Sequence, residues 1–239
     1  MCTREMTLGE EIINLVEKGV DIPTVERMYR KYIDLDEKGK SDIGDIDHYC
    51  IADVAATLNL YSILTADIRV GDRMMVPLGN LGTFTATVQQ VMNGKALFIF
   101  DDCVIRRPMN KDRDNAGGYF QSDLKEWIDT ELYNMFPAVL KQRMTGLSIP
   151  TVGEIYGYGD ELNRTHFEHD YYAQLPLMKL IRNRVTYYMN DWECCWLRNA
   201  TKIEYSSGSF ACVGRNGRVG SSSASESLGV RPEFWFYNK

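Results

Sequence analysis

The sequence has little of what marks several common classes of protein. It contains only 3 histidines and 6 cysteines in 239 residues, and no two cysteines have the CxxC spacing of many zinc and redox sites. No apolar run approaches the roughly 18 residues that a membrane-spanning helix needs. The first residues lack the apolar core of a secretory signal. We therefore expect no membrane span, free thiols in a reducing compartment, and a cytoplasmic or virion-associated protein.

Motifs that hold phosphate or carry a nucleophile are also absent, since GxGxxG after a strand, GxxxxGK[ST] and GxSxG do not occur. His166 and His169 form an HxxH pair, with Glu168 and Asp170 as the nearest further ligands. A metal site needs at least three converging ligands, and this stretch is polar, so we interpret it as a surface loop. The acidic residues of 101–114 alternate with basic ones that would repel a cation. We expect no metal, no cofactor and no catalytic residue.

The acidic charge is concentrated at the beginning of the chain. Residues 1–66 hold 7 basic and 13 acidic side chains, so they carry the whole net charge of −6. Apolar residues at helical spacing predict helices near 8–19, 23–33 and 47–61 in this segment. We predict a small acidic helical domain over 1–66, and its charge argues against a nucleic-acid partner.

From residue 67 the apolar pattern changes to that of strands. Residues 74–77 and 83–88 predict strands, and Asn93-Gly94 predicts a type I′ hairpin turn leading into 97–100, which is apolar on both faces. Between this hairpin and the C-terminal strands, the pattern predicts a loop and several short helices. They are a loop at 101–118, a helix capped by Ser122, a helix from Pro137 to Met144, a loop or helical turn at 151–159, and a helix at 175–181.

The C-terminal part contains three apolar runs that predict strands, at 194–198, 210–213 and 230–236, with Asn216-Gly217 as a second candidate I′ turn. Arg198 and Arg231 lie inside apolar strands. Because a buried guanidinium is costly unless it is paired, each requires a carboxylate or carbonyl partner.

Five short segments, in this order, resemble a domain family of bacterial and phage proteins. They are Gly117–Trp127, Ile155–Gly157, Trp196–Arg198, Val213–Gly217 and Ser227–Pro232. This uncharacterised family resembles the C-type-lectin-like fold of the variable proteins of diversity-generating retroelements and, more distantly, of formylglycine-generating enzymes. The resemblance covers roughly 84–239. It implies an α+β, C-type-lectin-like domain over 67–239, preceded by the helical domain, with the closing strand paired to residues 69–100.

The functional motifs of calcium-dependent C-type lectins and of formylglycine-generating enzymes are not found. The Glu-Pro-Asn and Trp-Asn-Asp motifs of calcium-dependent lectins are absent, and the nearest string, Asn190-Asp191-Trp192, has another order. The paired reactive cysteines of formylglycine-generating enzymes cannot be placed on Cys194, Cys195 or Cys212.

The resemblance implies a non-catalytic protein for ligand binding or receptor recognition, which presents a variable Ser/Gly/Tyr/Arg loop surface to a protein or glycan on a cell surface. Alternatives are an oxidase-type enzyme related to formylglycine-generating proteins, an intracellular adaptor binding through its N-terminal helices, and a Ser/Gly loop that only closes the β-structure. Homo-oligomerisation is left open. Carried over by position, the ligand-binding residues are Asn199, Thr201, Lys202, Glu204, Tyr205, Arg215, Asn216, Arg218, Ser221, Ser222 and Ser223.

Overall fold

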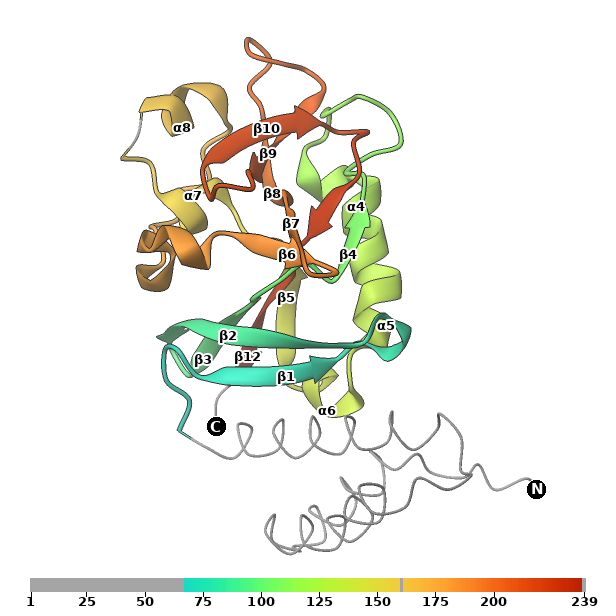
Figure 1. Cartoon of the computed structure of the whole chain (residues 1–239), viewed down its shortest axis with the longest axis vertical. Helices are drawn as coiled ribbons and strands as arrows, with labels where there is room; N and C mark the ends of the chain where they lie inside the picture. Colours follow the sequence, from blue (N-terminus) through green and yellow to red (C-terminus); the bar gives the residue numbers. More distant parts are fainter. Residues whose placement is uncertain (1–66, 160, 238–239) are drawn as a thin grey trace, which may run out of the picture.

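The computed structural model describes residues 67–159 and 161–237, which form a mixed α+β structure of two main sheets with few helices (Figure 1). The helices and the acidic domain predicted within 1–66 lie outside the described residues. None of the described helices is long and apolar enough to cross a membrane.

The first sheet joins the beginning of the described chain to its end. Its strand order is β1-β2-β3-β12-β5. The closing strand β12 pairs antiparallel with β3, so that Phe234 lies opposite Phe98, and the predicted pairing of the closing run with 69–100 is confirmed. Asn93 and Gly94 have φ values of 52° and 71°, as a type I′ turn requires. The strands are β1 (Arg73–Pro77), β2 (Thr83–Met92), β3 (Lys95–Phe100), β5 (Met144–Ser148) and β12 (Glu233–Tyr237).

The second sheet has the order β10-β9-β8-β11-β4. The apolar run 230–236 does not form one strand, because it divides at Arg231-Pro232 and supplies β11 to this sheet and β12 to the first. Residues 101–118 are not all loop, since they contain β4. The strands are β4 (Ile105–Arg107), β8 (Cys195–Ala200), β9 (Ser209–Val213), β10 (Val219–Ser223) and β11 (Leu228–Val230), and β6 (Thr186–Tyr188) with β7 (Asp191–Glu193) forms a separate ribbon.

The turn between β9 and β10 differs from the prediction. The Gly214 N–H donates to the Arg218 carbonyl over 2.8 Å, so three residues form the loop. Of these, only Gly217 has a positive φ, at 73°. The prediction of a type I′ turn at Asn216-Gly217 is therefore wrong, although a hairpin does connect β9 and β10.

The helices are short and several are not regular α-helices. Ser122 caps α4 as predicted, accepting from the Lys125 N–H over 3.1 Å. The helix expected from Pro137 ends at Lys141, because Met144 already belongs to β5, and the one expected at 175–181 is a pair of 3-10 turns. The elements are η1 (Gly79–Leu81), η2 (Tyr119–Gln121), α4 (Asp123–Trp127), the π-helical turn η3 (Ile128–Leu132), α5 (Tyr133–Met135), α6 (Ala138–Lys141), α7 (Val152–Tyr156), α8 (Glu161–His166), η4 (Pro176–Lys179) and η5 (Ile181–Asn183).

The described part of the chain has two hydrophobic clusters, and β3 and β8 contribute to both. Phe98 and Phe100 belong to the larger cluster, whereas Leu97 and Ile99, which alternate with them, belong to the smaller one. This explains why 97–100 is apolar on both faces, since each face of the strand covers a different cluster. In the larger cluster the rings of Phe98 and Phe234 stack at 5.4 Å.

We expect Gly229→Ala to destabilise the protein. A Cβ at position 229 would collide with the Cys103 sulfur and the Glu193 side chain, both of which are buried. Overpacking of this kind costs about 1–3 kcal/mol, so the melting temperature should fall by several degrees. Gly159→Ala is the matched control, because a Cβ there meets nothing within 4 Å. Equal melting temperatures for the two variants would contradict the packing.

Candidate functional site

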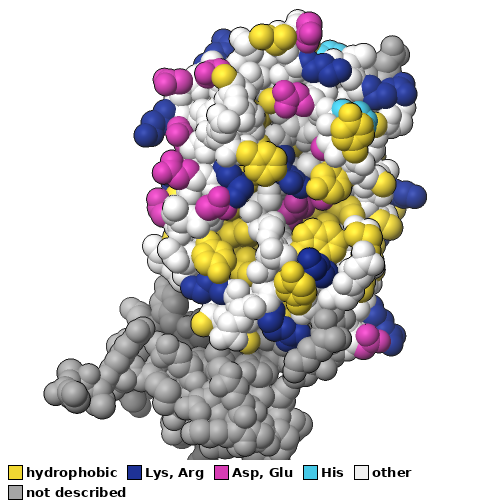
Figure 2. Space-filling view, turned by 180° about the vertical axis from the view of Figure 1, so that it is seen from behind, with side chains coloured by type: hydrophobic (Ala, Val, Ile, Leu, Met, Phe, Trp, Pro, Cys, Tyr) yellow, Lys and Arg dark blue, Asp and Glu magenta, His cyan; other side chains and the backbone are white. Residues whose placement is uncertain are grey.

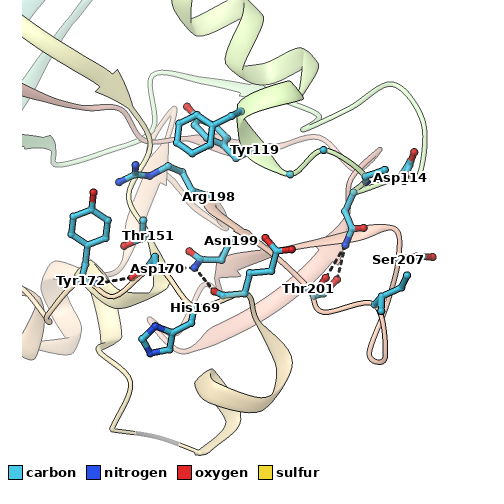
Figure 3. A pocket seen from close by; sticks show the side chains of 17 residues that line it. Asp114, Tyr119, Thr151, His169, Asp170, Tyr172, Arg198, Asn199, Thr201 and Ser207 are labelled. Atoms are coloured by element: carbon cyan, nitrogen blue, oxygen red, sulfur yellow. Dashed lines mark hydrogen bonds between the residues drawn. The ribbon is translucent and has the colours of Figure 1, made fainter.

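A cleft of about 680 Å³ lies over β8, between three loops. Figure 3 shows Tyr172 and Arg198 at one end of it and Asp114 and Ser207 at the other. The loops are 114–120, 168–172 and 203–207, and β8 with the residue after it supplies the floor. The residues that line the cleft include Asp114, Asn115, Tyr119, Phe120, Glu168, His169, Asp170, Tyr172, Arg198, Asn199, Thr201, Ile203 and Ser207.

Asn199 anchors the 168–172 loop to β8. Its Nδ2 donates over 2.8 Å to the Asp170 carboxylate and, also over 2.8 Å, to the Glu168 carbonyl. Its Oδ1 accepts from the Val152 N–H at the start of α7. Asp170 accepts in addition from the Gly153 N–H. Because these polar groups are paired with one another, side chains hold this wall of the cleft in place, together with the antiparallel bridge between Phe167 and Thr201 at the base of the loop.

A second anchor joins the opposite loops. The Asn115 amide nitrogen donates to the carbonyls of Thr201, Ser206 and Ser209 over 3.0–3.1 Å. Thr201 is itself buried, and its hydroxyl donates to the Ser209 carbonyl. The loop 114–120 is thereby tied to the loop between β8 and β9, and the cleft has defined walls on both sides.

Arg198 carries the charge in the floor of the cleft. Its guanidinium donates to Glu154 of α7 over 3.1 Å and to Glu233 of β12 over 2.9 Å, and both carboxylates are buried. The guanidinium also lies over the Tyr172 ring, 5.6 Å from its centre. The carboxylate partner predicted for Arg198 is confirmed. Arg231 has the carbonyl partners predicted for it, at Phe100 (2.6 Å) and Asn183 (3.1 Å).

The two carboxylates share this one guanidinium, so their charges are not fully compensated by it. Burial raises the pKa of Glu233 well above its usual value, and the nearby charge of Glu154 raises it further. Arg231 and Arg198 lower the pKa of Glu233 without cancelling these effects. The Glu233 carboxyl therefore takes up a proton at a higher pH than an exposed glutamate does.

The rim of the cleft carries large exposed side chains. Phe120 is 72% exposed, Tyr172 50% and Ile203 77%, and the carboxyl side chains of Asp114 and Glu168 also border the cleft. Apolar rings at a wet rim above a fixed polar floor are typical of a recognition site. The sequence-based list did not include Phe120, Tyr172, Asp114 or Glu168, because they lie far along the chain from β8.

The predicted ligand-binding residues are divided between separate places. Asn199 and Thr201 line the cleft but are buried in its hydrogen-bond network. Lys202, Glu204 and Tyr205 follow in the loop that contributes Ile203 and Ser207 to the cleft. Tyr205 packs against His166 with ring centres 4.2 Å apart, and Lys202 donates to the Arg164 carbonyl.

The remaining predicted residues lie away from the cleft. Arg215, Asn216 and Arg218 are exposed in the turn at the other end of β9, where Gly217 contacts Ile181. Ser221, Ser222 and Ser223 lie on the edge strand β10. The length of β9 separates Tyr205 from this turn, so the predicted ligand-binding residues do not form one continuous surface.

His169 lines the cleft, whereas the buried Cys103 and Cys195 do not. His169 stacks on Tyr158 with ring centres 3.7 Å apart, and no three metal-ligating side chains converge among the described residues. Cys103 and Cys195 share a hydrogen bond, which lowers the pKa of Cys195 and raises that of Cys103. Both are buried, and neither lines the cleft. The geometry that would favour the oxidase alternative, two cysteines together in a cleft, is not found in residues 67–159 and 161–237.

We expect the pH dependence of stability to report the raised pKa of Glu233. When the pKa of a glutamate is higher in the folded than in the unfolded protein, its protonation stabilises the fold. This stabilisation is fully present below the pKa of the unfolded state, about 4.3, and is lost as the pH rises through the pKa of the folded state. The melting temperature of the wild type should therefore fall relative to that of Glu233→Gln as the pH rises from about 4.3 towards 7. The exposed Glu226→Gln is the control. A difference between wild type and Glu233→Gln that is constant with pH would contradict the assignment.

Thiol labelling should separate buried from accessible cysteines. Cys103 and Cys195 are 2% and 1% exposed, so iodoacetamide should alkylate them only after unfolding. The half-buried Cys194 should react earlier in the native protein, as measured by peptide mass spectrometry. Rapid labelling of native Cys195 would instead support the oxidase alternative.

The arrangement is suited to holding a ligand between ordered loops, with ring faces and carboxyl groups as its contact points. No protein-family model, curated protein or solved structure matches the chain.

Proposed function

We propose that the protein is a non-catalytic ligand-binding protein on a C-type-lectin-like scaffold, and that it binds its ligand in the cleft over β8. The observation that carries this proposal is an open cleft of about 680 Å³ whose rim bears exposed rings and whose floor is fixed by buried ion pairs. A site whose walls are already in place binds with a smaller cost of ordering than a mobile loop surface would.

The arrangement of the strands supports the scaffold. The closing strand β12 pairs with β3, which follows the first strands of the described chain, and with β5. Two of the segments that carry the resemblance, Trp196–Arg198 and Ser227–Pro232, lie side by side, because Gly229 of β11 pairs with Cys195, which precedes Trp196 on β8. A scaffold of this kind brings its loops to one end while its sheets hold them from beneath.

The proposed partner is a protein or glycan on a cell surface, recognised by a phage-encoded or bacterial protein. The binding face differs from the one implied by the resemblance alone. The loop with Lys202, Glu204 and Tyr205 borders the cleft, but the turn with Arg215, Asn216 and Arg218 does not. The new contact residues are Phe120 and Tyr172, which line the cleft from two different loops. The adaptor alternative depends on residues 1–66, outside the described part.

We expect Phe120→Ala and Tyr172→Ala each to weaken ligand capture roughly tenfold, since aromatic anchors supply most of the binding energy at such sites. Capture is measured on a glycan array and a displayed-peptide library. Because Phe120 is 72% exposed, its removal should change the melting temperature little.

Trp192→Ala is the matched control. Trp192 is 56% exposed on β7 and does not line the cleft. Loss of capture in the control but not in the cleft variants would place the binding face elsewhere.

A further inference from the structure

A second cleft of about 230 Å³ adjoins the first, and Tyr172 lines both. Besides Tyr172, its lining includes Gln90 and Met92 of β2, Glu154, Tyr171 and Trp235. The partition between the clefts is rigid, because the Arg198–Glu154 ion pair has one partner lining each cleft and the Arg198 guanidinium supports the Tyr172 ring. The two clefts therefore meet at Tyr172, and a long ligand could pass over this ring from one cleft into the other.

We propose that this double cleft binds a linear, uncharged oligosaccharide, which lies across Tyr172 and occupies both sides. The inference rests on the proposed function and specifies its ligand. A compact ligand would occupy only the larger cleft. A chain of repeating sugar units can fill both clefts, because it presents the same chemical groups to each cleft.

Aromatic surface is available along the whole path. Phe120 lies in the first cleft, Tyr172 between the two, and Tyr171, 87% exposed, in the second. Figure 2 shows hydrophobic side chains, several with rings, gathered on the face turned away from the viewer in Figure 1. The apolar C–H face of a sugar ring packs on such side chains, while its hydroxyls remain free to form hydrogen bonds.

The polar groups suit hydroxyls better than anions. Arg198 is the one arginine or lysine among the residues that line the first cleft, and it is already paired with two buried carboxylates. Asp114 and Glu168 offer carboxylate oxygens, which accept hydrogen bonds from hydroxyls and repel anions. Acidic and sulfated glycans are therefore disfavoured.

The strands beneath the clefts do not suit an extended peptide. Peptide capture by strand addition requires an unpaired sheet edge. β8 pairs with β9 and β11, its Arg198 N–H donates to the Pro150 carbonyl, and β12 lies between β3 and β5. Recognition at both clefts must then come from side chains. Side chains bind sugars by packing against the rings and by forming hydrogen bonds with the hydroxyls.

Calorimetric titration with glucose and N-acetylglucosamine oligomers of increasing length tests the inference. We expect affinity to rise with chain length until both clefts are filled, and then to become constant. Tyr171→Ala, which removes a ring that lines the second cleft and not the first, should weaken binding of the long oligomers roughly tenfold and leave the shortest unchanged. Phe120→Ala should weaken all lengths. Heparin-derived oligosaccharides serve as the acidic control and should bind more weakly.

The outcomes separate this inference from the proposed function. Affinity that is independent of length, an equal effect of Tyr171→Ala at every length, tighter binding of the acidic control, or capture of peptides in place of glycans overturns the inference and leaves the function standing. Absence of binding to every glycan and peptide probe, or binding that neither Phe120→Ala nor Tyr172→Ala weakens, overturns both.

Discussion

The buried ion-pair cluster around Arg198 is the constraint on which the site depends. One guanidinium on β8 joins Glu154 of α7 to Glu233 of β12, so it connects both sheets and a helix. Charged groups removed from water are tolerated only with partners at hydrogen-bond distance, and removing one partner leaves an uncompensated charge. The positions of these elements are therefore coupled. Because Arg198 also lies over Tyr172, the same cluster sets the shape of the cleft.

The strands that carry this cluster are themselves held from two sides. β3 and β8 present alternate side chains to different hydrophobic clusters, and Trp196, fully buried, lies next to Leu197 of the other cluster. The closing segment crosses from one sheet to the other at Arg231-Pro232, where the Arg231 side chain donates to the Phe100 carbonyl. A segment fixed in both sheets leaves little freedom for the floor of the cleft to move.

The walls of the cleft are built differently from its floor. An amide side chain anchors each of the loops 114–120 and 168–172, and each amide, that of Asn115 and that of Asn199, makes several hydrogen bonds. Small changes in the outer side chains of these loops would leave those anchors in place. This separation of anchoring from contact allows the ring-bearing rim to serve recognition while the interior serves stability.

Local sequence patterns predict much of the local structure in the described part. Period-two alternation and Asn93-Gly94 specify the β2–β3 hairpin, Ser122 specifies a helix start, and an arginine within an apolar strand specifies a buried partner. These features depend on neighbours along the chain or on the cost of burying a charge. The three-dimensional fold sets the remaining features: Glu154 and Glu233 are the partners of Arg198, Phe120 and Tyr172 line one cleft, and the length of β9 separates Tyr205 from Arg215. Such pairings follow from packing between distant segments, and no local pattern encodes them.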